Sequence, residues 1–452
     1  MMARWLRMLA CSALGSVLAS WPLAAAELPQ ATQQILEKTK LPASILSGLD
    51  KELEMPADWL AGARKEKQLR IGGTWDPGQF NAFIKPFRER YPFLDVRYSR
   101  GTRFDRVTKP LIAYKTGRIL MDVISGIGAE FQVFKDADAI ENLAGIPNWS
   151  NVPASMQEKN GWWIGQRLRY WCMSYNTDRV SKDKLPKTWD DVINNPALSN
   201  QRLGMGNRPN LWLLPMWDMK GEAWTHSYSE KLFAINKPQL RKEGMNALIE
   251  LVIAGEFDVA LPSAEYRTKQ LMDKGAPIAW HCPEPVPMTI SEMIVVKGGN
   301  TNAAKMFVNW FMSKEGQVSQ FAADQAPPVH KDLQTREFLA FPDEILGRPV
   351  AYLEPETLEN DLDKLVKFWD PLWYTGMGLK LQVVHASIDE IGKGAIKFKV
   401  KDASQTARVN DERTRIFVDG EETETTELKA GMTCEITYAG NNQDATRLDC
   451  KS

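Results

Sequence analysis

Residues 168–178 read LRYWCMSYNTD, an apolar and aromatic run that ends in a polar Asn-Thr-Asp break. Residues 276–285 read APIAWHCPEP and have the same character. Both runs read as buried strands followed by a break, and each carries one cysteine. In a two-lobed protein such strands cross between the lobes and lie side by side, so these two runs decide the fold.

Strands and helices alternate on both sides of these runs. LRIGG (69–73), LDVRYS (94–99) and MDVISG (121–126) read as strands separated by helical patterns. The alternation resumes with EFDVALP (256–262) and PMTISEMIVVKGG (287–299), again with a helical pattern between them. Strands and helices in alternation at this spacing predict an α/β fold with a parallel sheet.

The C-terminal part of the chain follows another pattern. Residues 378–393 are predicted to complete the helical shell, and from about residue 394 apolar and polar residues alternate with period two. Asp419-Gly420 and Gly440-Asn441 supply turn signals between the alternating segments. This region is predicted to form a separate small β-barrel, OB-like in character, or a sandwich.

The N-terminus has the features of a secretory signal peptide. Arg4 and Arg7 precede an apolar run, and three alanines end that run before Glu27. Cys11 lies ahead of most of the apolar run, whereas a lipid-attachment cysteine should lie at its end. Cleavage after Ala26 and export of a soluble product are therefore expected.

The charge balance argues against nucleic acid as a partner. The chain has 56 Lys and Arg residues against 57 Asp and Glu residues, and residues 1–26 contain two of the basic ones. The mature chain would then carry a formal charge of −3, which offers no basic footprint for nucleic acid or an anionic membrane. No later segment approaches the roughly 20 consecutive apolar residues of a membrane span.

The exported chain would retain four cysteines, which allow three disulfide pairings. Cys434 and Cys450 both lie in the C-terminal β region and are predicted partners, closing a loop of about 15 residues. Cys172 and Cys282 lie in the two strand-like runs and are the second predicted pair. The alternative for that pair is two reduced cysteines in the core. No C-x-x-C pair is present, so a zinc site is not expected.

Motifs of common enzymes are missing from the sequence. It contains no G-x-S-x-G elbow, no P-loop and no H-E-x-x-H motif. Its four histidines show no recognisable pairing. His281 stands beside Cys282, but adjacent strand residues point to opposite faces, so a thiol–imidazole pair is not expected. The chain is therefore not expected to be an enzyme.

Several segments taken together resemble one family. The iron(III)-type family of bacterial extracellular solute-binding proteins opens with segments similar to WLAGARKEKQLRIGGTW (59–75), YPFLDVRYSRGT (91–102) and GRILMDVISG (117–126). In that family a Tyr-Asn-Thr sequence ends a lobe-crossing strand and a Pro-x-x-Trp-x-Asp helix start follows, as in YNTDRVSKDKLPKTWDDVINNPAL (175–198). Residues 255–285 also match in order and spacing. The resemblance extends over roughly residues 58–345.

The resemblance implies two α/β lobes joined by crossing strands, with LRYWCMSYN as a hinge strand. It also implies a periplasmic monomer that closes on a small-molecule ligand and delivers it to an inner-membrane ABC permease, with no cofactor. The expected division of the chain is a signal peptide (1–26), an N-terminal extension (27–57), lobe one (58–171 and 283–325), lobe two with C-terminal helices (172–282 and 326–393) and a small β domain (394–452).

Ligands of open α/β sheets bind beyond the carboxyl ends of strands, and this rule selects the candidate residues. Trp75 is expected to stack on the ligand or wall the cleft, the arginines to pair with its charge, and Gly126 to open backbone N–H groups to it. The alternatives are ordinary ion pairs for the arginines and turn roles for the glycines. The predicted ligand-binding set is Trp75, Arg100, Thr102, Ser125, Gly126, Tyr175, Asn207, Arg208, Glu265, Tyr266 and His330.

The class of ligand depends on two neighbouring residues. Ferric members of the family hold the metal largely through two adjacent tyrosines at the start of a lobe-two helix, where this chain has Glu265 and Tyr266. Because one phenol is missing, an organic or phosphorylated anion bound by arginine is preferred, and no metal site is expected. A ferric site of Tyr266, Glu265 and His330 is the first alternative. A cell-envelope interaction protein that uses its C-terminal β domain is the second.

Overall fold

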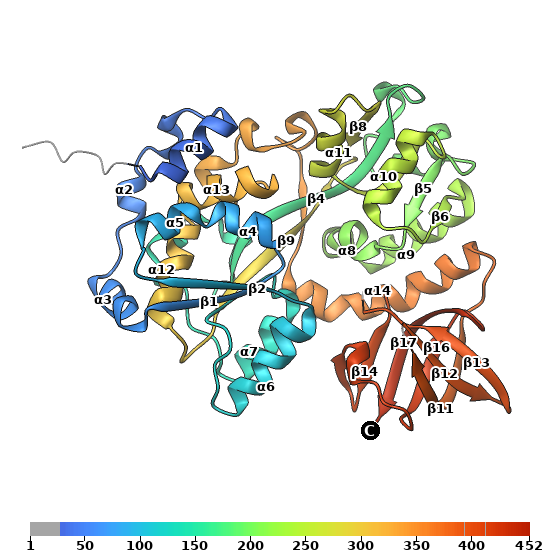
Figure 1. The fold of residues 1–452 in the computed structure, drawn as a ribbon. Helices are drawn as coiled ribbons and strands as arrows, with labels where there is room; N and C mark the ends of the chain where they lie inside the picture. The colour runs from blue at the N-terminus through green and yellow to red at the C-terminus, as the bar shows by residue number, and fades with distance from the viewer. Residues whose placement is uncertain (1–27, 393, 412) are drawn as a thin grey trace, which may run out of the picture.

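The computed structural model describes residues 28–392, 394–411 and 413–452. The expected signal peptide and Cys11 lie outside these residues. Two sheets organise the chain, a ten-stranded mixed sheet shared by two α/β lobes and a seven-stranded sheet near the C-terminus (Figure 1). Within the described residues, every helix is too short or too polar to cross a membrane.

Lobe one is built on β1 (Gln68–Gly73), β2 (Asp95–Arg100) and β3 (Val123–Ser125), which run parallel as predicted. Their apolar side chains form a core with the helices, because residues such as Leu69 and Ile71 are fully buried. The helices of this lobe are α3 (Ala57–Glu66), α4 (Pro77–Phe83), α5 (Lys85–Arg90), α6 (Lys109–Lys115), α7 (Phe131–Asp136), α12 (Thr301–Phe311) and α13 (Lys314–Asp324).

Lobe two contains β5 (Leu203–Gly206), β6 (Gln239–Arg241) and β7 (Val259–Ala264), which also run parallel. β7 is followed directly by α11 (Glu265–Met272), so the first residues of this helix stand at the carboxyl end of the sheet. The remaining helices are α8 (Pro209–Lys220), α9 (Glu222–Lys231) and α10 (Met245–Ala254), which ends at Gly255 in the left-handed conformation.

Two long strands join the lobes. The first half of β4 (Ile164–Asn176) pairs with β9 (Val286–Val295), which in turn pairs with β3 of lobe one. The second half of β4 pairs with β7 and with β8 (Ile278–His281) of lobe two. The predicted crossing strand is therefore confirmed, and Cys172 forms a disulfide with Cys282, with Cα atoms 5.1 Å apart.

Three predicted helices differ from the structure. The amphipathic pattern of NAAKMFVNWFMSKEGQVSQFAA (302–323) predicts one long helix, but the structure has two, because the Ser313 hydroxyl accepts a hydrogen bond from the N–H of Gly316 and caps a new N-terminus. The helix expected after Lys187 is only a 3₁₀ turn, Asp190–Val192. The helix expected over 378–393 is wrong, since β11 (Gln382–Gly392) pairs along its length with two strands of the C-terminal sheet.

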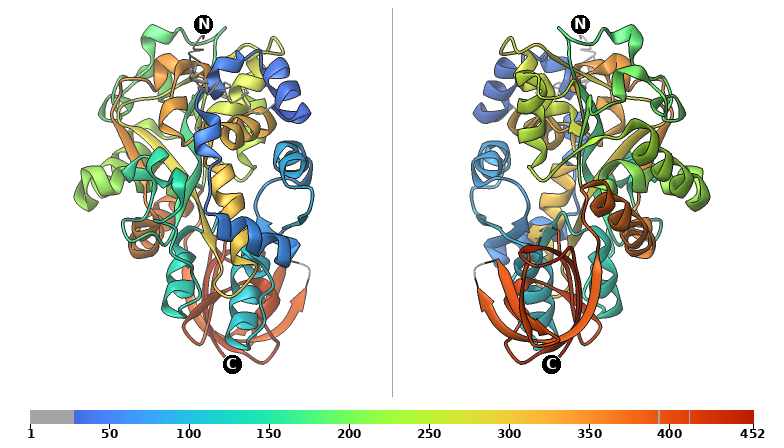
Figure 2. Two further views of the ribbon diagram at one scale, coloured as in Figure 1. Left: turned by 90° about the vertical axis from the view of Figure 1, so that its left-hand side faces the viewer. Right: turned by 90° about the vertical axis from the view of Figure 1, so that its right-hand side faces the viewer.

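The C-terminal sheet lies at the end of the molecule opposite the N-terminal helices (Figure 2). A long helix, α14 (Pro355–Gly376), leads into it, and β10 (Val350–Leu353) before this helix pairs with β9. Cys434 and Cys450 form the second predicted disulfide. The strands after β11 are β12 (Ala395–Val400), β13 (Ala403–Arg408), β14 (Arg415–Val418), β15 (Glu421–Thr423), β16 (Thr433–Tyr438) and β17 (Gln443–Lys451).

The residues before lobe one also form helices. The two α-helices of this segment are α1 (Gln30–Thr39) and α2 (Leu49–Glu52). The Thr32 hydroxyl donates to Glu315 on α13, with 2.6 Å between the oxygens, and Glu52 accepts from the backbone N–H of Lys314. The N-terminal extension is thus attached to the outer face of lobe one.

The second disulfide should stabilise the C-terminal sheet. In the Cys434→Ala/Cys450→Ala variant, we expect the free energy of local unfolding at β16 and β17 to fall by about 3 kcal/mol, because the bridge closes a short loop in a small core. Hydrogen exchange of the amides in these strands measures that loss. The Cys172→Ala/Cys282→Ala variant is the control and should leave their exchange unchanged. Equal protection in both variants would contradict the expected role.

Candidate functional site

The carboxyl ends of the two parallel sheets meet at the crossing strand. Arg167 and Arg169 lie two residues apart in β4, so their side chains leave the same face. Both pair with one carboxylate oxygen of Asp324 at the end of α13, at 3.1 and 3.3 Å. Arg167 also donates to the hydroxyl of Thr74, 2.7 Å away, at the carboxyl end of β1. Asp324 is buried, so two guanidinium groups share one desolvated negative charge.

Lobe two contributes Glu265 and Tyr266 from the first turn of α11. The guanidinium carbon of Arg169 lies 4.6 Å from the centre of the Tyr266 ring. One oxygen of Glu265 accepts a hydrogen bond from the N–H of Tyr170, and the other has no partner among the described residues. Burial raises the pKa of Glu265 to about 7. At neutral pH this carboxyl is therefore only about half ionised.

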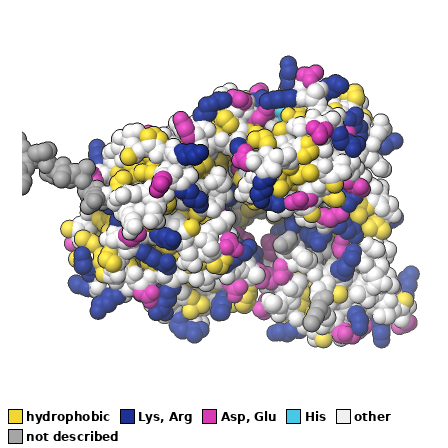
Figure 3. Space-filling model, turned by 45° about the horizontal axis from the view of Figure 1, so that its top comes forward, with side chains coloured by type: hydrophobic (Ala, Val, Ile, Leu, Met, Phe, Trp, Pro, Cys, Tyr) yellow, Lys and Arg dark blue, Asp and Glu magenta, His cyan; other side chains and the backbone are white. Residues whose placement is uncertain are grey.

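These six residues, Thr74, Arg167, Arg169, Glu265, Tyr266 and Asp324, are called the interlobe cluster below. Its balance of charge is positive, because two guanidinium groups face the carboxylate of Asp324 and the partly protonated carboxyl of Glu265. Tyr266 is partly exposed and also lines a cavity of about 600 Å³ between α11 and the end of α13. The space-filling view is hollowed where the two lobes and the C-terminal domain meet (Figure 3). Tyr266 thus lies at a cavity, with the guanidinium group of Arg169 from the crossing strand next to its ring.

Residues 120–342 match a family model described as bacterial extracellular solute-binding protein. The chain carries a bacterial extracellular solute-binding domain. No curated protein matches the chain.

Solved structures share the fold of this solute-binding domain. Iron-bound HitA from Pseudomonas aeruginosa is 20% identical with a TM-score of 0.55, and the match covers 68% of this chain and 99% of HitA. A putative extracellular solute-binding protein from Bordetella parapertussis is 17% identical with a TM-score of 0.58, covering 68% and 98%. Trichodesmium IdiA (FutA), solved with iron and citrate ligands, is 16% identical with a TM-score of 0.56, covering 68% and 99%. The likeness establishes the two-lobed fold, and about a third of this chain lies outside it.

Of the predicted ligand-binding residues, only Glu265 and Tyr266 belong to the interlobe cluster. Trp75 is next to it but is a core residue, with 1% of its surface exposed. Its ring lies 5.0 Å from that of Phe83 and 5.7 Å from that of Phe311, and Arg167 covers another side at 5.6 Å. The prediction that Trp75 stacks on the ligand is therefore wrong, because aromatic neighbours already enclose the indole.

The backbone amides predicted to face a ligand are already used. Gly126 donates its N–H to the carbonyl of Glu292, and Gly128 donates to the Glu292 carboxyl at 3.0 Å. Burial raises the pKa of this carboxyl to about 8. The Ser125 hydroxyl is buried and accepts a hydrogen bond from Gln166. The prediction of open amides at this strand end is wrong, because the backbone carbonyl of Glu292 accepts from Gly126 and its carboxyl group accepts from Gly128.

The other lobe-one candidates lie at the rim. Arg100 is exposed and pairs with Asp76 at 3.6 Å, which is the ordinary ion pair given as its alternative. The Thr102 hydroxyl bonds with Glu424 of the C-terminal domain, at 3.1 Å. Among the described residues, neither side chain forms a hydrogen bond or an ion pair with the interlobe cluster.

Three lobe-two candidates face other surroundings. Tyr175 is buried and pairs with Val259 at the start of β7, whereas the cleft lies at the end of that strand. Asn207 accepts a hydrogen bond from the indole of Trp369 on α14, at 2.7 Å. Arg208 lines a cavity of about 100 Å³ between lobe two, α14 and the C-terminal domain. The structure therefore separates these residues from Tyr266.

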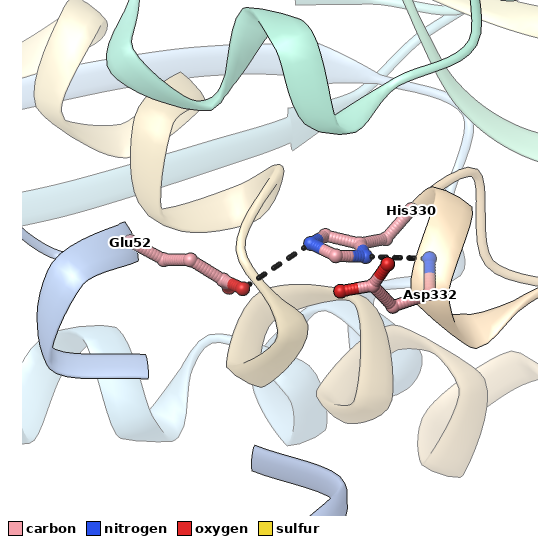
Figure 4. A group of neighbouring side chains, drawn as sticks. All are labelled: Glu52, His330 and Asp332. Carbon is pink, nitrogen blue, oxygen red and sulfur yellow. Dashed lines mark hydrogen bonds and ion pairs between the residues drawn. The ribbon is translucent and has the colours of Figure 1, made fainter. Parts of the chain in front are cut away.

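His330 is fully buried in a group with Glu52 and Asp332 (Figure 4). Its Nε2 lies 3.4 Å from Glu52, and its Nδ1 accepts from the N–H of Asp332. The ammonium group of Lys314 lies 3.3 Å from Glu52 and 3.1 Å from Asp332, so a cation already neutralises both carboxylates. The predicted set of Tyr266, Glu265 and His330 does not come together, and the histidine group attaches the N-terminal extension instead.

Arg167, Arg169 and Asp324 were not selected from the sequence. The rule used there examined the ends of strands, and these arginines lie inside one. A usable signal exists, since arginines at alternate positions of an otherwise apolar crossing strand place two charges on one face. The partner Asp324 gives no local signal, because only the fold brings the end of α13 to β4.

The raised pKa of Glu265 predicts a pH dependence of stability. Between pH 4.5 and about 7 the folded protein holds this proton and the unfolded chain does not, so the free energy of unfolding falls as pH rises. In Glu265→Gln, the decrease in the free energy of unfolding over this pH range should be smaller by about 3 kcal/mol. Urea unfolding across that pH range measures it. Glu230→Gln, on the exposed surface of α9, is the control, and the same slope in both variants would contradict the assignment.

Proposed function

We propose that this chain is a periplasmic binding protein that captures a ferric ion as an anionic carboxylate complex and delivers it to an inner-membrane permease. The observation that carries the proposal is the interlobe cluster, where one phenol stands beside two arginines. The protein performs no chemistry on the ligand in this proposal. Closure of the lobes around the complex provides the capture step.

The charge of the cluster disfavours a bare ferric ion. A trivalent ion needs several anionic oxygen ligands, and the cluster supplies one phenol and a carboxyl whose pKa is about 7. The nearby guanidinium groups would repel the ion. A complex that brings its own carboxylates presents a negative surface instead, and the Tyr266 phenolate can take a free coordination position on the metal.

The arginines suit the organic part of such a complex. Guanidinium groups recognise carboxylates through paired, charge-assisted hydrogen bonds, and Arg169 already makes one charge-assisted hydrogen bond to Asp324. HitA and IdiA (FutA), which share the fold, are described as iron-bound, the latter with citrate. These descriptions support a ferric complex over an unrelated anion. An iron-free carboxylate or phosphate, which the arginines alone could bind, is the second candidate.

Binding experiments separate these ligands. We expect ferric citrate to stabilise the mature protein and so raise its thermal midpoint. At one hundred times its dissociation constant, the ligand should add about 2.7 kcal/mol to the free energy of unfolding. Citrate alone and phosphate should give smaller shifts. Tyr266→Phe should abolish the visible phenolate-to-iron absorption band and weaken ferric citrate, while its effect on citrate alone stays small.

Arg169→Ala should weaken both ferric citrate and citrate by roughly thirtyfold, because a charged hydrogen-bonding partner is lost from a desolvated site. The matched control is Arg179→Ala, which removes an arginine paired with Asp258 away from the cluster and should leave affinity unchanged. Equal affinities for citrate with and without iron would favour the second candidate. Unchanged affinity in both Tyr266→Phe and Arg169→Ala would show that the ligand binds elsewhere.

A further inference from the structure

The C-terminal domain is attached firmly to lobe two through α14. Trp369 of this helix is fully buried, bonds to Asn207, and lies 5.1 Å from the ring of Phe233. On its other face, one oxygen of Asp363 accepts hydrogen bonds from Arg415 and Arg447 of the sheet, at 2.6 and 2.5 Å. The sheet, α14 and lobe two therefore move most easily as one unit.

The same domain also contacts lobe one at a single edge. Glu424 is buried, and its carboxylate accepts from the N–H of Phe104 at 2.6 Å and from the hydroxyl of Thr102 at 3.1 Å. Beside it, Arg103 donates to the carbonyl of Glu422 at 2.9 Å. These residues follow β2, at the carboxyl edge of the lobe-one sheet. A buried carboxylate that accepts a backbone N–H at this edge makes a specific contact. Breaking its hydrogen bonds costs free energy unless another donor takes their place.

The direct contacts with lobe two are weaker by comparison. Lys242 lies 3.3 Å from Asp444, and Arg413 donates to the Lys242 carbonyl at 3.4 Å. The first turns of α14 lie near residues 128–130 of lobe one, so the bridge spans both lobes. The domain sits below the two lobes and reaches both in the ribbon views (Figures 1 and 2).

We propose that the C-terminal domain is a latch on the two-lobed fold, in which Glu424 fastens lobe two and its attached sheet to lobe one. Separation of the lobes breaks the bonds from Glu424 to Phe104 and Thr102. The latch therefore slows both the entry and the release of ligand. This inference rests on the proposed function in one respect, that a ligand enters when the lobes open. The contact of Glu424 with lobe one does not depend on which ligand binds.

Spin labels report the latch without a ligand. Labels at Arg118→Cys in lobe one and Lys399→Cys on β12 are both at exposed positions, and in the described residues the mature cysteines are paired in two disulfides. We expect electron–electron distance measurements to give one dominant separation in the otherwise native protein. Glu424→Ala should add a longer population. Thr102→Ala, which leaves the bond from Phe104, should add a smaller one.

Stopped-flow binding of ferric citrate provides the second measurement. Glu424→Ala should raise the association and dissociation rates by roughly tenfold each, and change the dissociation constant less than either rate. The control is Glu421→Ala, an exposed glutamate in β15 with the same change of charge and no ion pair among the described residues. It should behave as the native protein.

The outcomes distinguish the latch from the ligand assignment. A longer distance in Glu424→Ala with no ferric citrate bound by any variant supports the latch and removes the proposed ligand. Native distances and native rates in Glu424→Ala, with ferric citrate still bound, overturn the latch and leave the ligand in place. Circular dichroism and the thermal midpoint of each variant establish that it is folded, and Thr102→Ala tests the same contact from lobe one.

Discussion

Two guanidinium groups share one buried carboxylate at the place where β4 passes between the lobes. Arg167 and Arg169 belong to the strand that both halves of the sheet use, and Asp324 ends a helix of lobe one. Removing the carboxylate would leave two like charges close together in a desolvated site. The two arginines therefore depend on Asp324 for their position in the fold. The arrangement fixes a positive centre at the hinge. A ligand that binds at this centre must be compatible with its positive charge.

Three buried carboxyl groups, on α11, α14 and β9, cost free energy unless they are protonated. Burial raises the pKa of Glu265 and Asp370 to about 7 and that of Glu292 to about 8. Each accepts or shares hydrogen bonds with the fold. Near neutral pH, Glu265 and Asp370 are about half protonated and Glu292 is mostly protonated. The positive charge of the arginines is therefore offset mainly by Asp324, and the surplus is available to a ligand.

The sequence predicted the lobes better than the site. The hydrophobic periodicity of the sequence was enough to predict the parallel strands and the crossing strand, because it shows which residues are buried. The positions of the cysteines in these segments were enough to predict both disulfides. Residues 382–392 were wrongly predicted as helix, since their strand is specified by pairing, with the neighbouring β12 and with β16, which lies about 40 residues further along the chain. Trp75 failed for a similar reason. A turn sequence places its backbone at a strand end, but only tertiary packing decides that the indole points into the core.

The failed strand-end predictions have a common physical cause. At the ends of β2 and β3 the expected donors exist, yet Glu424 and Glu292 from distant parts of the chain accept from neighbouring N–H groups. Strand-end donors select acidic partners whether these come from a ligand or from the protein itself. With both positions occupied internally, Tyr266 and Arg169 of β4 are the groups that the structure brings together between the lobes. The proposed ligand site therefore lies at the hinge and not at the strand ends, and a small change in the angle between the lobes would alter the contacts between its two halves.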